Sequence, residues 1–400
     1  MSSAAVVWIG LHDMSRTGVP IVLSRLLRAS SEQQRRSVHI IAIHGGPLLD
    51  ELGDLAESVI VLEPAGRRSV SGALVTGIRS VAAGRKPLSA SASAMESRFW
   101  RIRMLRLPRP DVLLLSGAGS WPLMGVVSAD TKVVLHLHEL ETGLDRSVPG
   151  REQKAAFDRA SRVMVVSGAV ADLARSRGAK GDRIVVVPGI VDSPSSGGDD
   201  GLAGNEVVGR TGPPQAHTDL DPDRTWVIGV GRPGWRKGTD RLAPIAYELG
   251  RRLPTSSVGW IGGAPTGQGA GWVDGSDPVT WVEEQVDPWS VADKASVLLI
   301  PSREDPLPLV ALEAGQRGLP VVAARTGGLP ELLSGGRGFV TSGQRLADLC
   351  DTTEHVLCNP DLAAEAGAAL SEYVEKHHTG AVVAPMWWDS IVGDTGSGDQ

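Results

Sequence analysis

The stretch IPSREDPLPLVALEAGQRGLPVVAARTGGLPELL, residues 300–333, contains one complete strand–helix–strand unit. Its first strand belongs to the buried run SVLLIPS (296–302), and two prolines stiffen the loop that follows. We expect a helix that begins near Leu309 and ends at Gly318, because glycine suits the left-handed residue that closes a helix. The run LPVVAAR (319–325) is the next strand. A helix between two such strands is typical of a parallel α/β sheet.

The same alternation of short β-branched runs and helical patterns extends over most of the chain. It becomes mainly helical after residue 342, with two adjacent tryptophans, Trp387 and Trp388, at the centre of the last helical pattern. Further strands are expected at 5–11, 37–44, 58–63, 111–117, 132–138, 162–167, 183–189, 225–231 and 256–263.

A chain of 400 residues exceeds one ordinary hydrophobic core, so the sequence predicts two α/β domains. Residues 193–222 lose all periodicity and are rich in Gly, Pro, Ser and Asp, which indicates a linker or a flexible excursion. The expected organisation is a first domain (1–192), this linker, a second domain (223–380), a crossover helix (381–392) and a disordered tail (393–400). We expect a ligand at the carboxyl ends of the strands, in a cleft between the domains.

Composition excludes several classes of protein. The net charge of −6 argues against a nucleic-acid-binding protein, which must neutralise many phosphates. We see no run of 18 apolar residues, and AAVVWIGL near the N-terminus is interpreted as a strand instead of a signal core. Cys350 and Cys358, the only cysteines, lie too far apart on one expected helix to form a disulfide. We therefore expect a cytoplasmic protein.

The loop before the helix at Leu309 has the features of an anion site. Two prolines fix its path, which leaves the backbone N–H groups of Leu307, Leu309 and Val310 as donors near a helix start. Two acids, Asp305 and Glu313, flank the turn and should lie on the order of 10 Å apart. That spacing is too long for the pair of a retaining glycosidase but suits two hydroxyl-bearing rings joined by a diphosphate. Ordinary solvated acids on a surface helix are the alternative.

A second anion-binding element is WVIGVGRPGWRKGTDRL, residues 226–242, a strand followed by a glycine-rich loop and a helix from about Thr239. Arg232 and Lys237 on this loop can neutralise the negative charge of a diphosphate. The glycines at 229, 231 and 234 also spell the dinucleotide-binding pattern, but the helix does not begin at the third glycine. An ordinary basic loop is the alternative reading of the two cations.

These two segments resemble glycosyltransferase family 4, whose members have the GT-B fold and retain the anomeric configuration of the sugar. The resemblance rests on an acid, seven residues and Glu313, followed by GLPVVA and GGLPE, and on Gly-Arg and Lys-Gly around the basic loop. It implies two Rossmann-like, doubly wound domains facing across a cleft, with the last helix crossing back to the first. Two departures are Asp305 where the family has Glu, and DPLPLV where EGFGLP is common.

The resemblance also implies a role for each site residue. Arg232 and Lys237 would hold the donor phosphates, Glu313 the nucleotide ribose, and Asp305 the hydroxyls of the transferred sugar. The segment VVLHLHELE (133–141) places His138 at a strand end, where family members have a histidine that contacts sugar or stabilises the reaction centre.

Two further residues of the first half complete this set. His136 points to the same side of the strand as His138 and is the alternative candidate for the histidine that contacts the sugar. Gly18, in a loop that resembles the family's first glycine-rich loop, would let the backbone approach the donor phosphate or the acceptor.

The expected activity is transfer of a sugar from a nucleotide-diphosphate sugar to a polysaccharide, glycolipid or natural-product hydroxyl, without a cofactor or a metal. The D-x-D motif at 221–223 precedes a strand instead of following one, so we reject it as a metal site. Alternatives are a nucleotide-sugar epimerase of related fold, a non-catalytic sugar-nucleotide binder and, on the glycine pattern alone, an NAD-dependent oxidoreductase. The basic amphipathic segment 97–110 could rest on the inner membrane face, or simply pack on the first domain.

Overall fold

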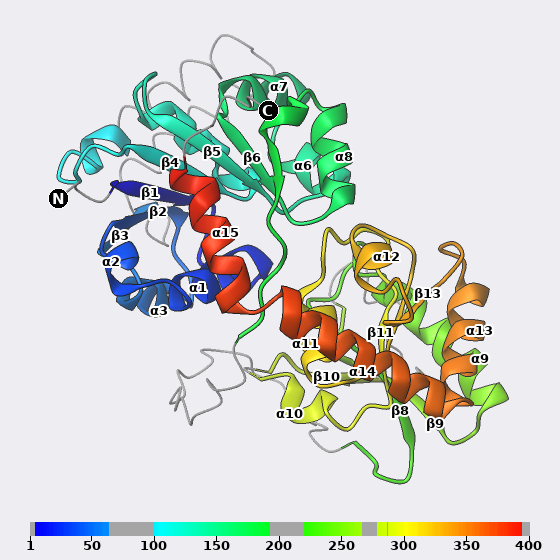
Figure 1. Cartoon of the computed structure of the whole chain (residues 1–400). Helices are drawn as coiled ribbons and strands as arrows, with labels where there is room; N and C mark the ends of the chain where they lie inside the picture. The colour runs from blue at the N-terminus through cyan, green and yellow to red at the C-terminus, as the bar shows by residue number, and fades with distance from the viewer. Residues whose placement is uncertain (1–4, 64–99, 193–219, 266–277, 286, 394–400) are drawn as a thin grey trace, which may run out of the picture. The chain divides into compact units, whose positions relative to one another are not determined.

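The computed structural model describes residues 5–63, 100–192, 220–265, 278–285 and 287–393 (Figure 1). The chain divides into two compact units, one formed by 1–190 with 380–400 and the other by 191–379. The expected linker and tail lie, apart from residues 220–222 and Gly393, outside the described residues.

The described part of the first unit forms a seven-stranded parallel sheet in the order β3-β2-β1-β4-β5-β6-β7. The central strands are buried along their whole length and almost entirely apolar, because helices cover both faces of a parallel sheet, as VWIGL in β1 and VLLLS in β4 show. The strands are β1 (Val7–Leu11), β2 (Val38–His44), β3 (Ser58–Glu63), β4 (Val112–Ser116), β5 (Lys132–Leu137), β6 (Arg162–Val165) and β7 (Ile184–Val186).

The helices of the first unit include α15 (Gly380–Val392), the last helix of the chain, which returns to this unit as expected. It packs on α1 and β4 through the buried Trp387 and Trp388, and the indole N–H of Trp388 donates to Ser30 Oγ over 2.8 Å. The others are α1 (Gly18–Arg28), α2 (Glu32–Arg35), α3 (Leu49–Asp54), α6 (Glu141–Ser147), α7 (Gly150–Arg159), α8 (Gly168–Ser176) and the 3₁₀ helices η1 (Ala118–Val126) and η2 (Gly181–Arg183).

The described part of the second unit forms a six-stranded parallel sheet in the order β10-β9-β8-β11-β12-β13. Numbered within the unit, this order is 3-2-1-4-5-6, the order of the Rossmann fold, and the first unit begins in the same way. The strands are β8 (Thr225–Val230), β9 (Ser256–Ile261), β10 (Val279–Val282), β11 (Val297–Ile300), β12 (Val321–Ala323) and β13 (Phe339–Val340).

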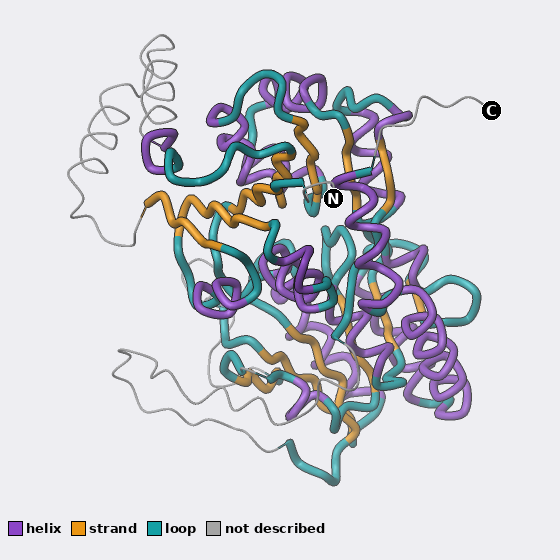
Figure 2. The backbone as a smooth tube through the Cα atoms, turned by 60° about the vertical axis from the view of Figure 1, so that its left-hand side comes forward, coloured by secondary structure: helices purple, strands orange, loops and turns teal. Residues whose placement is uncertain are grey.

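Alternate residues of β8 point into two separate cores. Trp226 and Ile228 pack with residues of α11 and α14, whereas Val227 packs with residues of α9 and α13. The sheet is therefore doubly wound, with helices on both faces (Figure 2). The helices are η4 (Thr239–Arg241), α9 (Leu242–Arg252), α10 (Trp289–Ala292), α11 (Leu309–Gln316), α12 (Leu329–Leu332), α13 (Leu346–Leu357) and α14 (Pro360–His377).

The expected strands are all present, β3 with the expected bounds and the others shorter at one or both ends, and the expected helix after the proline loop is α11. Two strands were not predicted from the sequence, β10 and β13, which are four and two residues long. Both are edge strands of the second sheet, and each is held by pairing with a neighbouring strand, β9 and β12 respectively.

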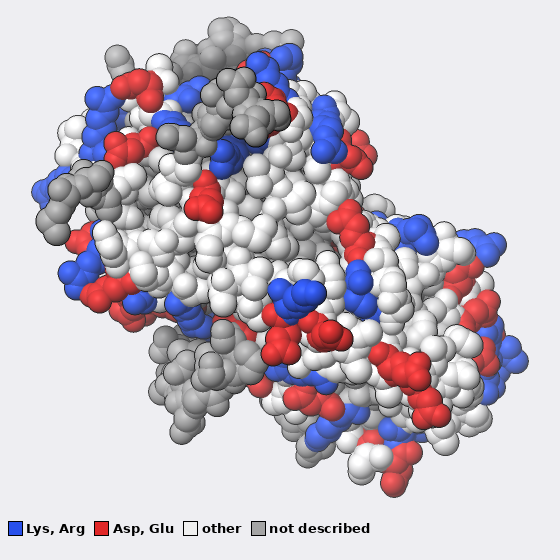
Figure 3. Space-filling view, in the orientation of Figure 1, with Lys and Arg blue, Asp and Glu red and all other residues white. Residues whose placement is uncertain are grey.

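The surface carries basic and acidic side chains interspersed over the face that Figure 3 shows. Many form ion pairs with their neighbours, such as Arg252 with Glu248, Asp351 and Glu354.

Cys350 and Cys358 are free thiols, the first buried and the second exposed. Among the described residues, no helix combines the length and the apolar character needed to cross a membrane.

Candidate functional site

Two loops meet at the centre of the second sheet. One (231–238) follows β8 and the other (301–308) follows β11, and these two strands are hydrogen-bonded neighbours. The order of the strands reverses between them, since β9 and β10 lie on one side and β12 and β13 on the other. Doubly wound sheets bind ligands at the carboxyl ends of the strands at this point.

Backbone contacts hold the two loops together. Gly238 has a φ of +72°, and a Cβ at this position would lie 2.2 Å from the carbonyl oxygen of Pro301, so only glycine fits. The N–H of Arg303 donates to the carbonyl of Arg236 over 2.9 Å, and the Arg236 guanidinium donates to the carbonyl of Glu304, also over 2.9 Å. The loops therefore form one rigid platform.

An ion pair joins two of the expected site residues. Lys237 Nζ lies 2.7 Å from Asp305 Oδ2, and the side chains are only 19% and 5% exposed. Ser302 Oγ lies 3.4 Å from the same carboxylate oxygen, and Arg236 Nη1 lies 4.0 Å from it. Asp305, itself largely closed to water, therefore meets two cations and one hydroxyl.

The start of α11 supplies the expected donors. The helix begins at Leu309 after Pro308, and Ala311 is the first residue whose N–H donates back, to Pro308. Within the described residues, the N–H groups of Leu307, Leu309 and Val310 donate to no other group, while their side chains pack partly buried against the core. Their donors are available to an anion at the end of the helix dipole.

Glu313 lies one turn further along α11. Its Oε2 accepts a hydrogen bond of 3.1 Å from the indole Nε1 of Trp289, a residue that is 4% exposed. The loop Thr326-Gly327-Gly328 packs behind Asp305. Gly327 has a φ of +52°, and a Cβ there would overlap the carbonyl oxygen of Asp305 at 1.7 Å.

Arg232, the remaining cation expected at this site, lies on the same loop as Lys237 and is exposed. It forms no ion pair with any residue in the described part of the chain. Among the described residues, Arg232 is therefore a cation without a counter-ion, in the first half of a loop whose second half carries the Lys237–Asp305 pair.

Several residues in and around the two loops were not predicted from the sequence. Arg236 adds a cation near Asp305, and Trp289 contacts Glu313. Arg303 binds Asp240 through two hydrogen bonds of 2.6 Å, and these bonds lower the pKa of that carboxyl. The adjacent Arg-Lys pair in RKG was a signal for Arg236, but the other contacts depend on the arrangement of strands.

The first unit carries the other expected residues at the carboxyl ends of its own strands. Gly18 is the first residue of α1 and is exposed, and nothing lies within 4 Å of a Cβ placed there. His138 directly follows β5, and its ring centroid lies 4.0 Å from that of His136. The two histidines share a side of the strand, as the sequence predicted.

Burial keeps both imidazoles neutral. It lowers the pKa of His138 to about 4 and that of His136 well below its usual value of 6.5, with the neighbouring imidazole adding to the effect on His136. The Nε2 atoms of both rings are buried, with no hydrogen-bond partner in the described structure. His138 is therefore neutral near pH 7, and its Nε2 has no partner among the described residues.

Glu139, which the sequence analysis did not select, fixes the backbone around His138. One carboxylate oxygen accepts from the N–H of His138 over 2.9 Å, and the other accepts from the N–H of Ala118 over 2.8 Å. The end of β5 is thereby tied to the loop after β4, with Gly117 at a φ of +78° in the turn.

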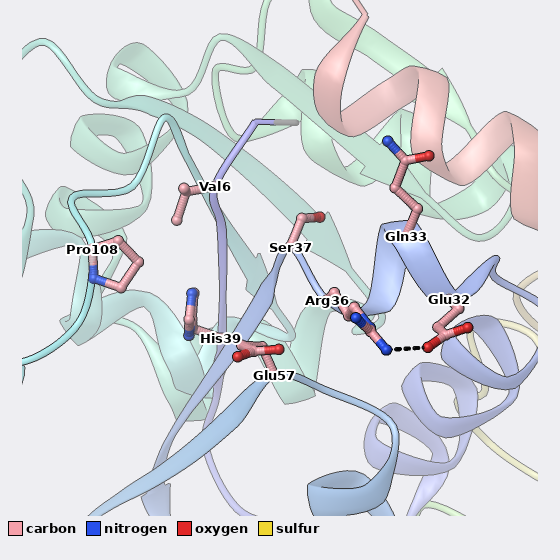
Figure 4. A pocket seen from close by; sticks show the side chains of 8 residues that line it. All are labelled: Val6, Glu32, Gln33, Arg36, Ser37, His39, Glu57 and Pro108. Atoms are coloured by element: carbon pink, nitrogen blue, oxygen red, sulfur yellow. Dashed lines mark hydrogen bonds and ion pairs between the residues drawn. The ribbon is translucent and has the colours of Figure 1, made fainter. Parts of the chain in front are cut away.

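A hollow of about 910 Å³ opens at the opposite edge of the first sheet, near the amino ends of β1, β2 and β3 (Figure 4). His39 and Glu57 line it, together with an ion pair between Arg36 and Glu32. Since ligands of doubly wound sheets bind at the carboxyl ends, this hollow is separate from the site around His138.

Residues of two motifs that do not indicate a ligand here, the dinucleotide-binding glycine pattern at 229–234 and the D-x-D motif at 221–223, have structural roles. A Cβ at Gly229 would lie 2.4 Å from the ring of Trp260, so this glycine makes room for a core tryptophan. The first acid of the D-x-D motif, Asp221, accepts from the N–H of Asp223 and, through its carbonyl, from Trp226 Nε1. Among the described residues, no three His, Cys, Asp or Glu side chains are grouped to hold a metal ion.

Comparison with known proteins gives matches to both halves of the chain. A family model described as Glycosyltransferase Family 4 matches residues 17–193, and one described as Glycosyl transferases group 1 matches residues 224–359. The chain is 30% identical over 163 residues to the sulfoquinovosyl transferase SQD2 of Arabidopsis thaliana, covering 39% of this chain and 31% of the relative. It is 32% identical over 174 residues to a D-inositol 3-phosphate glycosyltransferase of Gordonia bronchialis, covering 39% and 38%. The chain thus spans about a third of the length of these relatives.

Solved structures match the fold over nearly the whole chain. Anabaena Alr3699/HepE, in complex with UDP and glucose, superposes with a TM-score of 0.68 at 16% identity, covering 97% of this chain and 99% of that one. A glycosyltransferase from Rickettsia africae superposes with a TM-score of 0.69 at 12% identity, covering 96% and 97%. These neighbours confirm the expected pair of Rossmann-like domains.

Proposed function

The chain belongs to glycosyltransferase family 4, with the GT-B fold, and from this premise we propose that it moves a sugar from a nucleoside-diphosphate sugar to an acceptor hydroxyl. The observation that carries the proposal is the convergence of Lys237, Asp305 and the start of α11 between β8 and β11, where the strand order of the second sheet reverses. We call this place the switch point of the sheet. Solved neighbours of the same fold bind UDP and UDP-glucose, which supports a donor of this class.

The diphosphate would lie between the basic loop and the start of α11. Arg232 and Lys237 supply positive charge, and the N–H groups of Leu307, Leu309 and Val310 supply hydrogen bonds. Each donor aimed at the charge that develops on the leaving phosphate is worth roughly 3–4 kcal/mol of barrier. Because cations and helix amides act together here, we propose that the reaction needs no metal ion.

The two acids would contact the sugars at either end of the diphosphate. Glu313 would accept hydrogen bonds from the ribose, and Asp305 from hydroxyls of the transferred sugar. The pair between Lys237 and Asp305 supports this order along the donor, since it sets the sugar-binding acid next to a phosphate-binding cation.

We propose that the transfer retains the anomeric configuration. The bond from the anomeric carbon to the phosphate oxygen breaks, and the acceptor oxygen bonds to the same face of that carbon. The proton of the acceptor hydroxyl passes to the leaving phosphate oxygen. His138, neutral because burial lowers its pKa to about 4, would exchange a hydrogen bond with a sugar hydroxyl without adding charge. Gly18 would leave room at the start of α1 for the donor phosphate or the acceptor.

A glycolipid acceptor is supported by the segment 100–110 of the first unit. Trp100 and Met104 are buried, whereas Ile102 and Leu105 are 64% and 77% exposed, between exposed arginines. Apolar tips flanked by cations suit a membrane surface with anionic lipids. We propose peripheral membrane contact through this segment, of which residues 97–99 lie outside the described structure.

The test is a screen of UDP-, GDP- and ADP-sugars by thermal shift, followed by nucleotide release with pooled acceptors. A transferase releases nucleotide quickly only when an acceptor is present, whereas an epimerase converts the donor alone and a non-catalytic binder releases nothing. We expect Arg232→Ala to lower turnover by about 10²–10³-fold with folding intact. Wild-type turnover in this variant would remove the diphosphate assignment.

A further inference from the structure

We propose that Trp289 is a positioning residue, which holds the carboxylate of Glu313 in the orientation that receives the ribose hydroxyls of the donor. The inference rests on the proposed function, because it assumes that Glu313 binds ribose. It adds a residue of α10 to a site otherwise built from the loops after β8 and β11 and from α11.

The contact between the two side chains is direct. The indole Nε1 of Trp289 donates to Glu313 Oε2 over 3.1 Å, although the two residues are 24 positions apart. Trp289 is 4% exposed and belongs to the core cluster under α11, so its ring has no room to turn away.

One further contact of the ring, and two contacts around it, hold the indole in place. The backbone N–H of Trp289 donates to Asp287 Oδ1 over 3.0 Å, which fixes the start of α10. The guanidinium of Arg317 lies over the ring, with Cζ 4.4 Å from its centroid. Arg317 is itself held by Asp293, whose Oδ1 lies 3.0 Å from Arg317 Nε. The indole N–H is therefore a fixed donor.

A fixed donor matters because the last torsion of a glutamate is soft. Rotation about the bond to the carboxylate has broad minima, so an unrestrained carboxylate presents its oxygens over a range of angles. Binding two adjacent hydroxyls demands one plane. A hydrogen bond from Trp289 to Oε2 selects that plane before the nucleotide arrives, which lowers the ordering cost of binding.

The experiment compares UDP with 2′,3′-dideoxyuridine diphosphate, which lacks both ribose hydroxyls, by titration calorimetry. Guanosine and adenosine pairs are used if the screen above selects another base. We expect Trp289→Phe to reduce the preference for the hydroxylated nucleotide about tenfold, the size of one charge-assisted hydrogen bond. Affinity for the dideoxy nucleotide should stay at the wild-type value.

Trp226→Phe is the matched control. Trp226 belongs to the same core cluster, is 5% exposed, and donates its indole N–H over 2.9 Å to the carbonyl of Asp221. This variant loses the same atom from the same core without touching Glu313. Its preference for the hydroxylated nucleotide should equal that of the wild type, so a general loosening of the core is distinguished from a loss at the site.

Glu313→Gln separates failure of the inference from failure of the proposed function. If this variant loses the preference while Trp289→Phe keeps it, Glu313 binds ribose and the role of Trp289 is refuted. If no nucleoside diphosphate binds the wild type, or if Glu313→Gln keeps the full preference, the ribose assignment itself is refuted and the inference with it.

A measurement on the wild type covers the case in which Trp289→Phe does not fold. In protein labelled with ¹⁵N-tryptophan, the indole N–H bound to Glu313 is the one whose chemical shift changes in Glu313→Gln. We expect UDP to shift this resonance and the dideoxy nucleotide to leave it in place. An indole resonance that responds equally to both nucleotides, or no resonance that responds to Glu313→Gln, would overturn the proposal.

Discussion

Replacing Lys237 by methionine tests the ion pair on which the donor site depends. The substitution keeps most of the side-chain volume but removes the ammonium that lies 2.7 Å from Asp305. The carboxylate of Asp305, 5% exposed, then remains in the protein without its main counter-ion. Removing one partner of a buried pair typically costs 3–5 kcal/mol.

The expected cost is about 3 kcal/mol, at the lower end of that range. Lys237 is 19% exposed, so water already screens part of the interaction, and Arg236 Nη1 at 4.0 Å can take over part of it. For a domain of roughly 150–250 residues, 1 kcal/mol corresponds to about 2–4 °C in melting temperature. Lys237→Met should therefore lower the melting temperature of the second unit by about 6–12 °C.

A double variant separates stability from catalysis. Lys237→Met with Asp305→Asn leaves no unpaired charge, and replacing both partners of a buried pair is close to neutral. Its melting temperature should return to within about 4 °C of the wild type. Turnover should stay about 10²–10³-fold low in both variants, because neither has the cation that stabilises the leaving phosphate.

Scanning calorimetry gives the melting temperatures, and the transition of the second unit is the one that nucleotide raises. Nucleotide release under saturating donor gives turnover. A Lys237→Met protein that melts within 2 °C of the wild type would refute the claim that the pair is buried and stabilising. A double variant that regains turnover along with stability would refute the role of Lys237 in catalysis.

Three further predictions concern the first unit. Gly18→Ala should keep the wild-type melting temperature or raise it, since the added Cβ has no neighbour within 4 Å. Turnover should fall about tenfold if a ligand approaches the backbone at this position. Normal turnover would exclude that approach. Burial lowers the pKa of His138 from 6.5 to about 4, so between these two values the unfolded chain binds a proton that the folded chain does not. The contribution of His138 to the free energy of unfolding should therefore be complete above pH 6.5 and fall by up to about 1.4 kcal/mol per pH unit toward pH 4. Urea unfolding of His138→Asn should show a shallower decline over this range. Ile102→Glu with Leu105→Glu should abolish sedimentation with phosphatidylglycerol vesicles, and Tyr247→Glu, at a residue 70% exposed in the second unit, should leave it unchanged.

The parallel sheets could be predicted from the sequence because their strands are apolar on both faces. Runs such as VHIIAIH in β2 and VLLLS in β4 stand out against any helix period. The strands β10 and β13 could not be predicted in this way. VTWV is only half buried, and FV is two residues long, so each becomes a strand through pairing with a neighbour that only the folded sheet supplies.

The site was predictable where chemistry lies in short segments. The basic loop and the proline loop each carry the residues that we expect to bind an anion, and the placement of these residues follows from the strands that precede the loops. The pair between Lys237 and Asp305 was not predictable, because it spans 68 positions and requires β8 and β11 to be neighbours. Trp289 was hidden among eleven tryptophans, most of which serve the core, and only the contact with Glu313 distinguishes it.

The two units share one strand order but differ in the charge at the carboxyl ends of their strands. In the second unit the switch point presents Arg232, Arg236 and Lys237, a concentration of positive charge that a diphosphate requires. In the first unit the corresponding edge presents a neutral His138, whose backbone N–H donates to the carboxylate of Glu139, and an open Gly18. Neutral donors and acceptors suit the hydroxyls of a sugar, because a hydroxyl gains little from a net charge and a buried charge costs solvation. On the proposed function, we therefore expect the cations of the second unit to bind the donor diphosphate and His138 of the first unit to meet a sugar hydroxyl.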